Sequence, residues 1–162
     1  MKPKVYVETS VVSYLTARLS RDVVILGNQV VTRDRWRDAG ERFELVVSTL
    51  VLEEAGDGDP HASRDRLVAL EPLTVLDASD DSIALANALI QARAIPDGAA
   101  QDAAHIAIAV VNGVEYLSTW NFRHIANPVA AYRIEQACRA AGYEPAKICT
   151  PRQLMEARYE EL

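Results

Sequence analysis

Short strand-forming runs alternate with longer helical stretches along the whole chain. The runs combine β-branched, aromatic and other apolar residues, and they cover residues 4–8, 43–47, 73–76, 116–118 and 147–149. Between the runs, apolar residues are spaced as on amphipathic helices. Strands that alternate with helices in this way form a parallel sheet covered on both faces. The sequence therefore predicts an α/β fold with about five parallel strands, and ligand-binding side chains are expected beyond the carboxyl ends of those strands.

Helix-start and helix-stop signals divide the segments between these runs. The hydroxyl groups of Thr9, Ser10, Ser48 and Ser79 are expected to cap helices, and Gly113 to end one in the left-handed conformation. The predicted helices cover residues 9–15 and beyond, 22–42, 49–55, 60–70, 79–94, 96–112, 128–141 and a last segment opened by a capping box at 150–153. A chain of 162 residues has the length of one typical domain, so we expect a single domain over residues 1–162.

Composition narrows the class of protein. Hydrophobic residues make up 49% and charged residues 25% of the chain, which is the balance of a globular protein. No apolar run approaches the roughly 18 residues that a membrane helix needs, and the apolar segment behind Lys2 and Lys4 is too short for a signal peptide. Cys138 and Cys149 lack CxxC spacing and indicate neither a disulfide framework nor a thiolate zinc site. We therefore expect a cytoplasmic protein that does not bind a membrane.

The chain is acidic overall, with 17 lysines and arginines against 23 acids and a formal net charge of −6. This balance argues against a protein that coats nucleic acid through bulk charge, so any contact with nucleic acid must be local. The arginines between Arg33 and Arg42 are expected to give the predicted helix 22–42 a basic outer face. Such a face can guide an acidic strand, although exposed helix charge usually serves solubility.

Common active-site motifs are absent from the sequence. It contains no GxGxxG after the first strand, no GxxxxGK[ST], no GxSxG and no HExxH. Residues 56–59 are similar to the start of a calcium loop but lack its later glutamate, so they favour a solvated turn. Nucleotide-binding and serine-hydrolase functions therefore lose most of their support.

Acidic residues remain as the candidates for chemistry. Glu8 ends the first strand run, where a carboxylate after three apolar residues is expected to point into the crevice beyond the sheet. Glu53 and Glu54 lie early in the helix after the second run, where the helix dipole alone also favours negative charge. Asp102 shares a helix face with His105 and apolar residues, and needs a partner to stay ionised there. A bound divalent cation would be such a partner.

Polar side chains gather behind the fourth strand run. Residues 118–124 place hydroxyl, amide, basic and imidazole groups at the rim where a substrate would arrive. Oxygen ligands from separate segments suit Mg²⁺ or Mn²⁺, which activate water and shield the charge of a phosphodiester. The residue types therefore indicate hydrolysis of nucleic acid.

Four segments carry a family pattern: VYVETS at 5–10, STLVLEE at 48–54, DAAHIA at 102–107 and LSTWN at 117–121. Together they resemble the PIN-domain family, specifically its VapC-like toxin branch, over nearly the whole chain. The resemblance implies a three-layer α/β/α sandwich and a metal-dependent ribonuclease that is usually dimeric. Many such proteins are toxins neutralised by an antitoxin encoded beside them. We therefore expect RNA as the substrate, a homodimer and a cognate antitoxin as partner.

The resemblance also implies which residues hold the metal. The family's first acid falls on Glu8, one methylene longer than the usual aspartate. The second falls on Glu54, with Glu53 left open as an alternative, and the third falls on Asp102. Asn121 stands where a fourth acid is common, so the site lacks one negative charge and we expect one metal ion rather than two.

Each candidate residue receives an expected role. The expected catalytic residues are Glu8, Glu54, Asp102 and Asn121, the metal ligands for Mg²⁺ or Mn²⁺ are Glu8, Glu54 and Asp102, and the substrate contacts are Thr9, Ser10, Thr119 and Arg123. Asn121 would orient water or phosphate. Thr9 and Ser10 could either bind phosphate or brace Glu8, and Ser10 could instead only cap the helix. Because three neighbouring acids repel one another without a cation, at least one should have a raised pKa. His105, His124 and Trp120 have two interpretations, contact with RNA or ordinary packing.

Two other functions fit parts of the pattern. One is a PIN-fold module that binds nucleic acid or protein with a catalytically weakened site, since Glu8 and Asn121 depart from the family pattern. The other is a receiver-like phosphoacceptor domain, because that fold also gathers acids at strand ends. The receiver reading has less support, because the first strand run carries no acidic pair.

Overall fold

The strands of the structure form one parallel sheet. The structure is a computed structural model, and it describes residues 1–156. The sheet has the order β3-β2-β1-β4-β5 and is built from β1 (Lys4–Val7), β2 (Glu44–Ser48), β3 (Thr74–Leu76), β4 (Tyr116–Ser118) and β5 (Lys147–Cys149). Every neighbouring pair is parallel. The predicted parallel sheet of about five strands is confirmed.

The strand order places β1 at the centre of the sheet. The chain moves outward from β1 through β2 to β3 and then crosses back to β4 on the other side of β1. The carboxyl ends of β1 and β4 therefore flank the point where the strand order reverses, which is where open α/β sheets bind ligands. Receiver domains have the strand order 2-1-3-4-5. The receiver-like alternative is therefore wrong.

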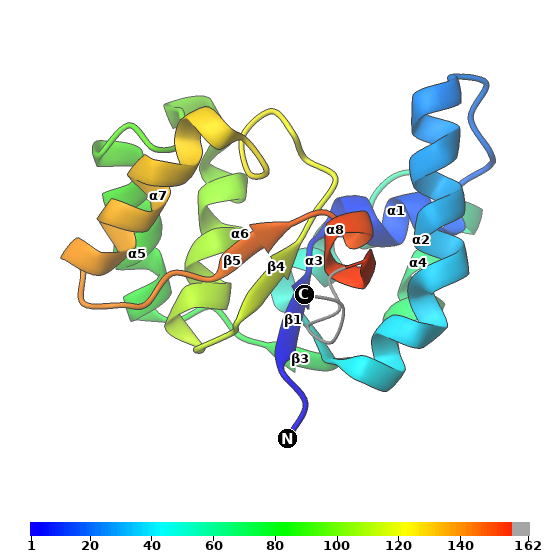
Figure 1. Cartoon of the computed structure of the whole chain (residues 1–162), viewed down its shortest axis with the longest axis horizontal. Helices are drawn as coiled ribbons and strands as arrows, with labels where there is room; N and C mark the ends of the chain where they lie inside the picture. Colours follow the sequence, from blue (N-terminus) through cyan, green and yellow to red (C-terminus); the bar gives the residue numbers. More distant parts are fainter. Residues whose placement is uncertain (157–162) are drawn as a thin grey trace.

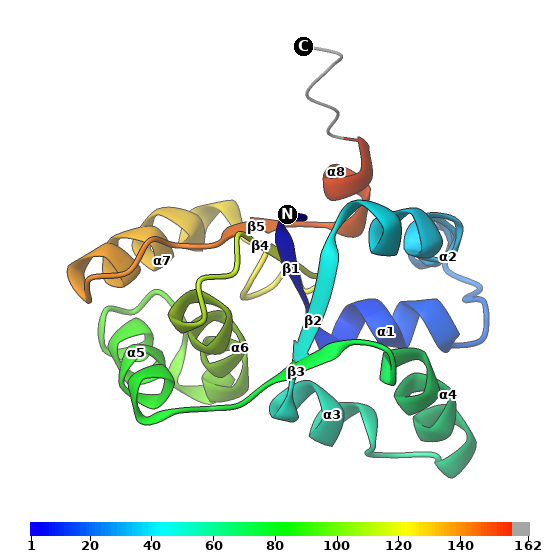
Figure 2. The ribbon, with the colours of Figure 1, turned by 90° about the horizontal axis from the view of Figure 1, so that it is seen from below.

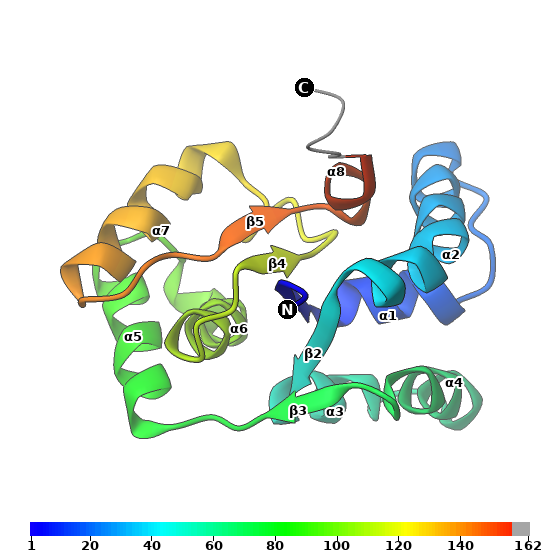
Figure 3. The same ribbon diagram turned by 60° about the horizontal axis from the view of Figure 1, so that its bottom comes forward.

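Helices cover both faces of the sheet, as Figures 1, 2 and 3 show. One layer contains α5 (Asp80–Gln91), α6 (Ala100–Val111) and α7 (Pro128–Ala140), and the other contains α1 (Thr9–Thr16), α2 (Val23–Arg42) and α4 (Pro60–Leu70). The shorter helical segments are α3 (Thr49–Ala55), the 3-10 turn η1 (Asp97–Ala99) and α8 (Pro151–Glu156). The predicted three-layer α/β/α sandwich is confirmed. Among residues 1–156, no helix is both long enough and apolar enough to cross a membrane.

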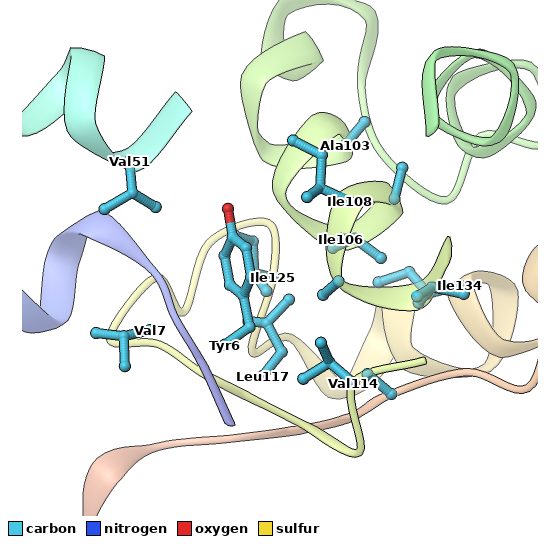
Figure 4. Packing of buried hydrophobic residues seen from close by; sticks show 14 of the residues in the cluster. Tyr6, Val7, Val51, Ala103, Ile106, Ile108, Val114, Leu117, Ile125 and Ile134 are labelled. Atoms are coloured by element: carbon cyan, nitrogen blue, oxygen red, sulfur yellow. The ribbon is translucent and has the colours of Figure 1, made fainter. Parts of the chain in front are cut away.

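The core surrounds the central strand. Val5, Tyr6 and Val7 of β1 are at most 2% exposed, and Figure 4 shows Tyr6 packed beside Leu117 of β4. Burying an apolar side chain of this size contributes about 1.5–3 kcal/mol, so this cluster is the main source of stability. Tyr6 differs from its neighbours because its hydroxyl points out of the apolar cluster toward the space between α3 and α6 (Figure 4).

Two helix boundaries differ from the prediction. The N-cap residue of α1 is Glu8, whose side chain accepts the backbone N–H of Ser10, whereas Thr9 and Ser10 were expected to cap this helix. The predicted helix 79–94 ends earlier, at Gln91, because the chain turns through Arg93 in the left-handed region at φ 57°. Both differences arise where the backbone serves contacts between distant segments rather than the helix itself.

The outer face of α2 is less basic than predicted. Its first turn exposes Val23 and Val24, which are 78% and 68% accessible. Arg33 does not face outward as a free charge, because its guanidinium donates hydrogen bonds to the carbonyls of Leu15 and Ala17. This arginine fastens the end of α1 to α2, and the exposed end of α2 is apolar.

Candidate active site

The predicted acids lie at the carboxyl edge of the sheet. Glu8 directly follows β1, and Glu54 lies on α3, which follows β2. Asp102 occupies the first turn of α6. Asn121 lies in the loop after β4, next to the point where the strand order reverses. The topology therefore brings residues from four separate segments to one edge.

Glu8 is a buried carboxylate held by three donors. Its side chain is 6% exposed. Its Oε1 accepts the hydroxyls of Ser10 at 2.7 Å and Thr119 at 2.5 Å, and its Oε2 accepts the backbone N–H of Ser10 at 2.9 Å. These bonds replace the hydrogen bonds to water that the carboxylate oxygens lose on burial.

The hydroxyls of Ser10 and Thr119 are committed to Glu8. Each hydroxyl gives its one proton to Glu8 Oε1 and accepts a backbone N–H, from Trp120 at 2.8 Å and from Asn121 at 2.9 Å respectively. Ser10 and Thr119 thus link the end of β1 to the loop after β4. For Ser10 the bracing contact with Glu8 is one of its two expected roles, whereas Thr119 was expected to contact substrate and also braces Glu8.

Glu54 rather than Glu53 faces the site. Glu54 Oε1 accepts the Thr9 hydroxyl at 2.6 Å and lies 2.5 Å from His105 Nε2. Glu53 is exposed and makes no side-chain hydrogen bond or ion pair among residues 1–156. Glu54 Oε2 also accepts no hydrogen bond from this part of the chain, so it is the oxygen open to a ligand. Helical periodicity could not separate two successive glutamates, and the structure does.

A buried chain of hydrogen bonds stands behind Glu54. His105 Nδ1 lies 2.7 Å from the Tyr6 hydroxyl, which in turn lies 2.7 Å from Ser48 Oγ. Tyr6, His105 and Ser48 have no exposed surface. Burial raises the pKa of Tyr6, so its phenol is neutral and has one proton to donate.

The direction of this chain follows from the charge on Glu54. Burial favours a higher pKa of Glu54, but the hydrogen bonds from His105 and from the Thr9 hydroxyl outweigh it and hold the pKa below its ordinary value. An ionised Glu54 only accepts, so His105 Nε2 donates to it and Nδ1 accepts the Tyr6 hydroxyl. Ser48 then donates to Tyr6. Every proton in the chain has an acceptor, and His105 is locked as a donor.

The pKa of Glu54 is shifted against the direction that repulsion between neighbouring acids favours. Repulsion was expected to raise the pKa of at least one of the acids, and at Glu54 the hydrogen-bond donors shift the pKa the other way. The sequence showed the acids without the groups that donate to them. Tyr6 and Ser48 were missed for the same reason, although a tyrosine in a central buried strand was a usable signal.

Asp102 has its own pair of partners. Asn121 Nδ2 donates to Asp102 Oδ1 at 3.1 Å, and His124 Nδ1 lies 2.8 Å from Asp102 Oδ2. Asn121 Oδ1 accepts the backbone N–H of His124 at 3.1 Å, which fixes the orientation of the amide. The side chains of Asp102 and His124 are 22% and 24% exposed, respectively. Asn121, which stands where the resemblance places a fourth acid, and His124 both bond to Asp102 instead of adding a carboxylate.

Three residues offer ligand atoms at metal-binding separation. Oxygens of Glu8 and Glu54 and a ring nitrogen of His105 lie within 4.8 Å of one another. Among the described residues, Asp102 does not join Glu8 and Glu54 in a group at that distance. It is linked to Glu8 indirectly, through Asn121 and Thr119.

The aromatic residues behind β4 divide into one buried and one exposed ring. Trp120 is 5% exposed, its Nε1 donates to Thr32 at 2.9 Å, and its ring stacks on Tyr14 at a centroid distance of 5.9 Å. It therefore packs in the structure rather than stacking on a base. Phe122 is 54% exposed, and Arg123 beside it is exposed as well.

The fold matches chains of solved complexes. A chain of VapBC-1 from nontypeable Haemophilus influenzae has a TM-score of 0.58 and 14% identity, over 92% of this chain and 98% of that chain. A chain of VapBC2 from Rickettsia felis, in a complex bound to a DNA fragment from their promoter, has a TM-score of 0.54 and 14% identity, over 74% of this chain and 89% of that chain. No family model and no curated protein matches the sequence. The likeness is one of fold, and the expected PIN-like, VapC-like fold is confirmed.

Proposed function

We propose that this chain is a metal-dependent endoribonuclease that hydrolyses phosphodiester bonds of RNA. The observation that carries the proposal is that carboxylate oxygens of Glu8 and Glu54 lie within 4.8 Å of each other at the carboxyl edge of the sheet, with His105 beside them as the hydrogen-bond partner of Glu54. The fold shared with chains of two VapBC complexes supports a toxin of that kind.

The donor set fits Mg²⁺ or Mn²⁺. Glu8 and Glu54 offer carboxylate oxygens, which hard divalent cations prefer, and Asp102 adds a third carboxylate at the same edge. These three acids are the proposed ligands. When bound, the cation would lower the pKa of a coordinated water and neutralise charge on the phosphate.

The protein's own side chains set the geometry of these acids. Ser10 and Thr119 hold Glu8, while Thr9 and His105 hold one oxygen of Glu54 and leave the other free. Hydrogen-bonded partners of this kind orient metal ligands before the ion arrives.

The substrate side of the site is formed by the loop after β4. Asn121 places its amide nitrogen 3.1 Å from Asp102 Oδ1, where its second amide proton can orient a water or a phosphate oxygen. Arg123 is exposed in the same loop and is assigned to a phosphate of the RNA.

We further propose an antitoxin partner, a homodimer and a cytoplasmic location. Both similar structures are VapBC complexes. An uncovered apolar surface also supports a protein partner, because Leu19, Val23 and Val24 at the start of α2 are 54%, 78% and 68% exposed.

A binding module with a weakened site is the second candidate. It is favoured by the amide of Asn121 and the imidazole of His124, which occupy the two partner positions of Asp102 and add no negative charge. Such a module would bind RNA or protein with little dependence on a divalent cation.

A cleavage assay on labelled RNA separates the two candidates. The purified chain is incubated with Mg²⁺, with Mn²⁺ and with EDTA, beside Asp102→Asn prepared in the same way. Cleavage that needs the cation and is lost in the variant is the expected result. Equal cleavage by both proteins contradicts the proposal, because it indicates a contaminant or another site. RNA binding without cation-dependent cleavage also contradicts it and favours the binding module.

A further inference from the structure

Three arginine side chains line one open pocket beside Asp102. The pocket lies between the C-terminal end of α5 and the N-terminal end of α7, and Arg93, Arg123 and Arg133 supply its charges. His124 also lines it. The Nδ1 atom of His124 lies 2.8 Å from Asp102 Oδ2, so the pocket and the candidate active site share a wall.

This pocket is cationic in an acidic protein. The chain has 17 basic and 23 acidic residues, yet no aspartate or glutamate lines the pocket. Among residues 1–156, Arg93, Arg123 and Arg133 have no carboxylate within 4.0 Å. Three cationic residues around a concave surface that no acid lines create a positive potential that attracts an anion.

The end of α5 holds two of the arginines together. The left-handed φ of 57° at Arg93 belongs to the backbone motif that ends this helix, in which Ala94 N–H bonds the carbonyl of Leu89. The carbonyl of Arg93 accepts a hydrogen bond from Arg133 Nη1 at 3.3 Å. The N-terminal end of α7, whose dipole is positive there, forms another part of the wall through Val129 and Ala130.

We propose that this pocket binds a phosphate group of the RNA strand, next to the phosphate that is hydrolysed. Planar guanidinium groups recognise phosphate oxygens in pairs, which favours phosphate over a carboxylate-bearing or apolar ligand. A strand is favoured over a free nucleotide because the pocket is open and continues into the site at Asp102 through His124. This inference rests on the proposed ribonuclease function and names the side chains that hold its substrate.

RNA binding without cleavage tests the pocket. Fluorescence anisotropy of a fluorescein-labelled single-stranded RNA is measured in EDTA for the wild type and for Arg93→Gln, Arg123→Gln and Arg133→Gln. The matched control is Arg139→Gln, which removes the same charge from an exposed position of α7 outside the pocket. Thermal unfolding of each variant verifies that the protein folds.

Each pocket variant is expected to weaken RNA binding about tenfold, as for the loss of a charged hydrogen bond, whereas the control stays within about twofold. The slope of log affinity against log salt concentration should fall by about 0.7 for each pocket arginine removed. Equal loss in the control and the pocket variants would overturn the proposal, because bulk charge would then explain the binding.

Two parallel measurements identify the ligand and separate this inference from the proposed function. Calorimetry with inorganic phosphate alone should show no tight binding. If phosphate binds tightly through these arginines while the pocket variants keep the RNA affinity of the wild type, the pocket binds a free anion instead. If the wild type cleaves RNA and the pocket variants bind RNA as tightly as Arg139→Gln does, the proposed role of the pocket is overturned and the ribonuclease function stands. A wild type that binds RNA through these arginines but never cleaves it would contradict the ribonuclease function instead.

Discussion

The two halves of the candidate site are built differently. In the half formed by Glu8 and Glu54, carboxylates are held by hydroxyls and by a histidine with no exposed surface. In the half formed by Asp102, the partners are Asn121 and His124 on a loop, and the side chains of Asp102 and His124 are each more than a fifth exposed. The exposure of the acids themselves does not separate the halves, because the side chains of Glu54 and Asp102 are 24% and 22% exposed. The partners do separate them: Glu54 is held by the fully buried His105, whereas Asp102 is held by residues of a loop. The first half is therefore tied to the core, and the second is tied to a loop. Changes in the first half should therefore affect stability as well as activity, and changes in the second mainly activity.

The largest expected effect is on cleavage when Glu54, in the half tied to the core, is neutralised. Glu54→Gln should lower the rate of RNA cleavage at least about 100-fold, because partners and ligands of a metal site act strongly on its affinity. Glu53→Gln is the matched control, since Glu53 is the exposed neighbour on the same helix. Equal losses in the two variants would show that the structure has assigned the wrong glutamate.

A change behind Glu54 should lower stability. Tyr6→Phe removes the hydroxyl that connects Ser48 and His105, and leaves a buried donor and acceptor unpaired. The free energy of unfolding is expected to fall by about 1–3 kcal/mol, measured by urea denaturation. Tyr116→Phe is the control, because the Tyr116 hydroxyl makes no hydrogen bond among the described residues. A Tyr6→Phe variant as stable as its control would show that the buried chain contributes nothing.

A charge added to the half formed by Asp102 should change stability less, and the sign of the change should depend on the cation. Asn121→Asp replaces the amide that donates to Asp102 with a second carboxylate. Without a cation the variant should lose about 1 kcal/mol of stability through repulsion, and Mn²⁺ should restore it and bind more tightly than to the wild type. Asn28→Asp makes the same change on α2, away from the site. A loss of stability that Mn²⁺ does not reverse would show that no cation binds beside Asp102.

The smallest expected effect is on the pH dependence of stability. His105 and Thr9 hold the pKa of Glu54 below its ordinary value of 4.5 despite the opposing effect of burial. A carboxyl with a lower pKa in the folded chain stabilises the fold above its unfolded pKa, and this contribution disappears as the pH falls through the folded pKa. The stability advantage of the wild type over Glu54→Gln should therefore be constant from neutral pH to about pH 5 and shrink below that. A stability advantage of the wild type that grows as the pH falls would contradict the lowered pKa of Glu54.

The sequence predicted much of the fold because its signals are local. The capping hydroxyls of Ser48 and Ser79 bond the N–H groups of Val51 and Ser82 as expected. The capping box at Thr150 and Gln153 is also confirmed. Each signal lies within three residues of the group it satisfies, so no tertiary information was needed.

The interior of the site could not be predicted because its contacts are distant in the sequence. Tyr6 and His105 are 99 positions apart, and Thr119 and Glu8 are 111 positions apart. Composition and periodicity say nothing about such pairs. The same limit explains the wrong cap of α1: Glu8 replaces Thr9 and Ser10 as cap because Ser10 is bonded to the loop after β4.

Calorimetric titration with Mn²⁺ at neutral pH tests the central claim most directly, because it depends only on whether Glu8 and Glu54 can hold a cation together. The expected result is binding of about one ion per chain by the wild type and by Glu53→Gln, with binding lost in Glu54→Gln. Absence of Mn²⁺ binding by the wild type, or unchanged binding by Glu54→Gln, would contradict the claim.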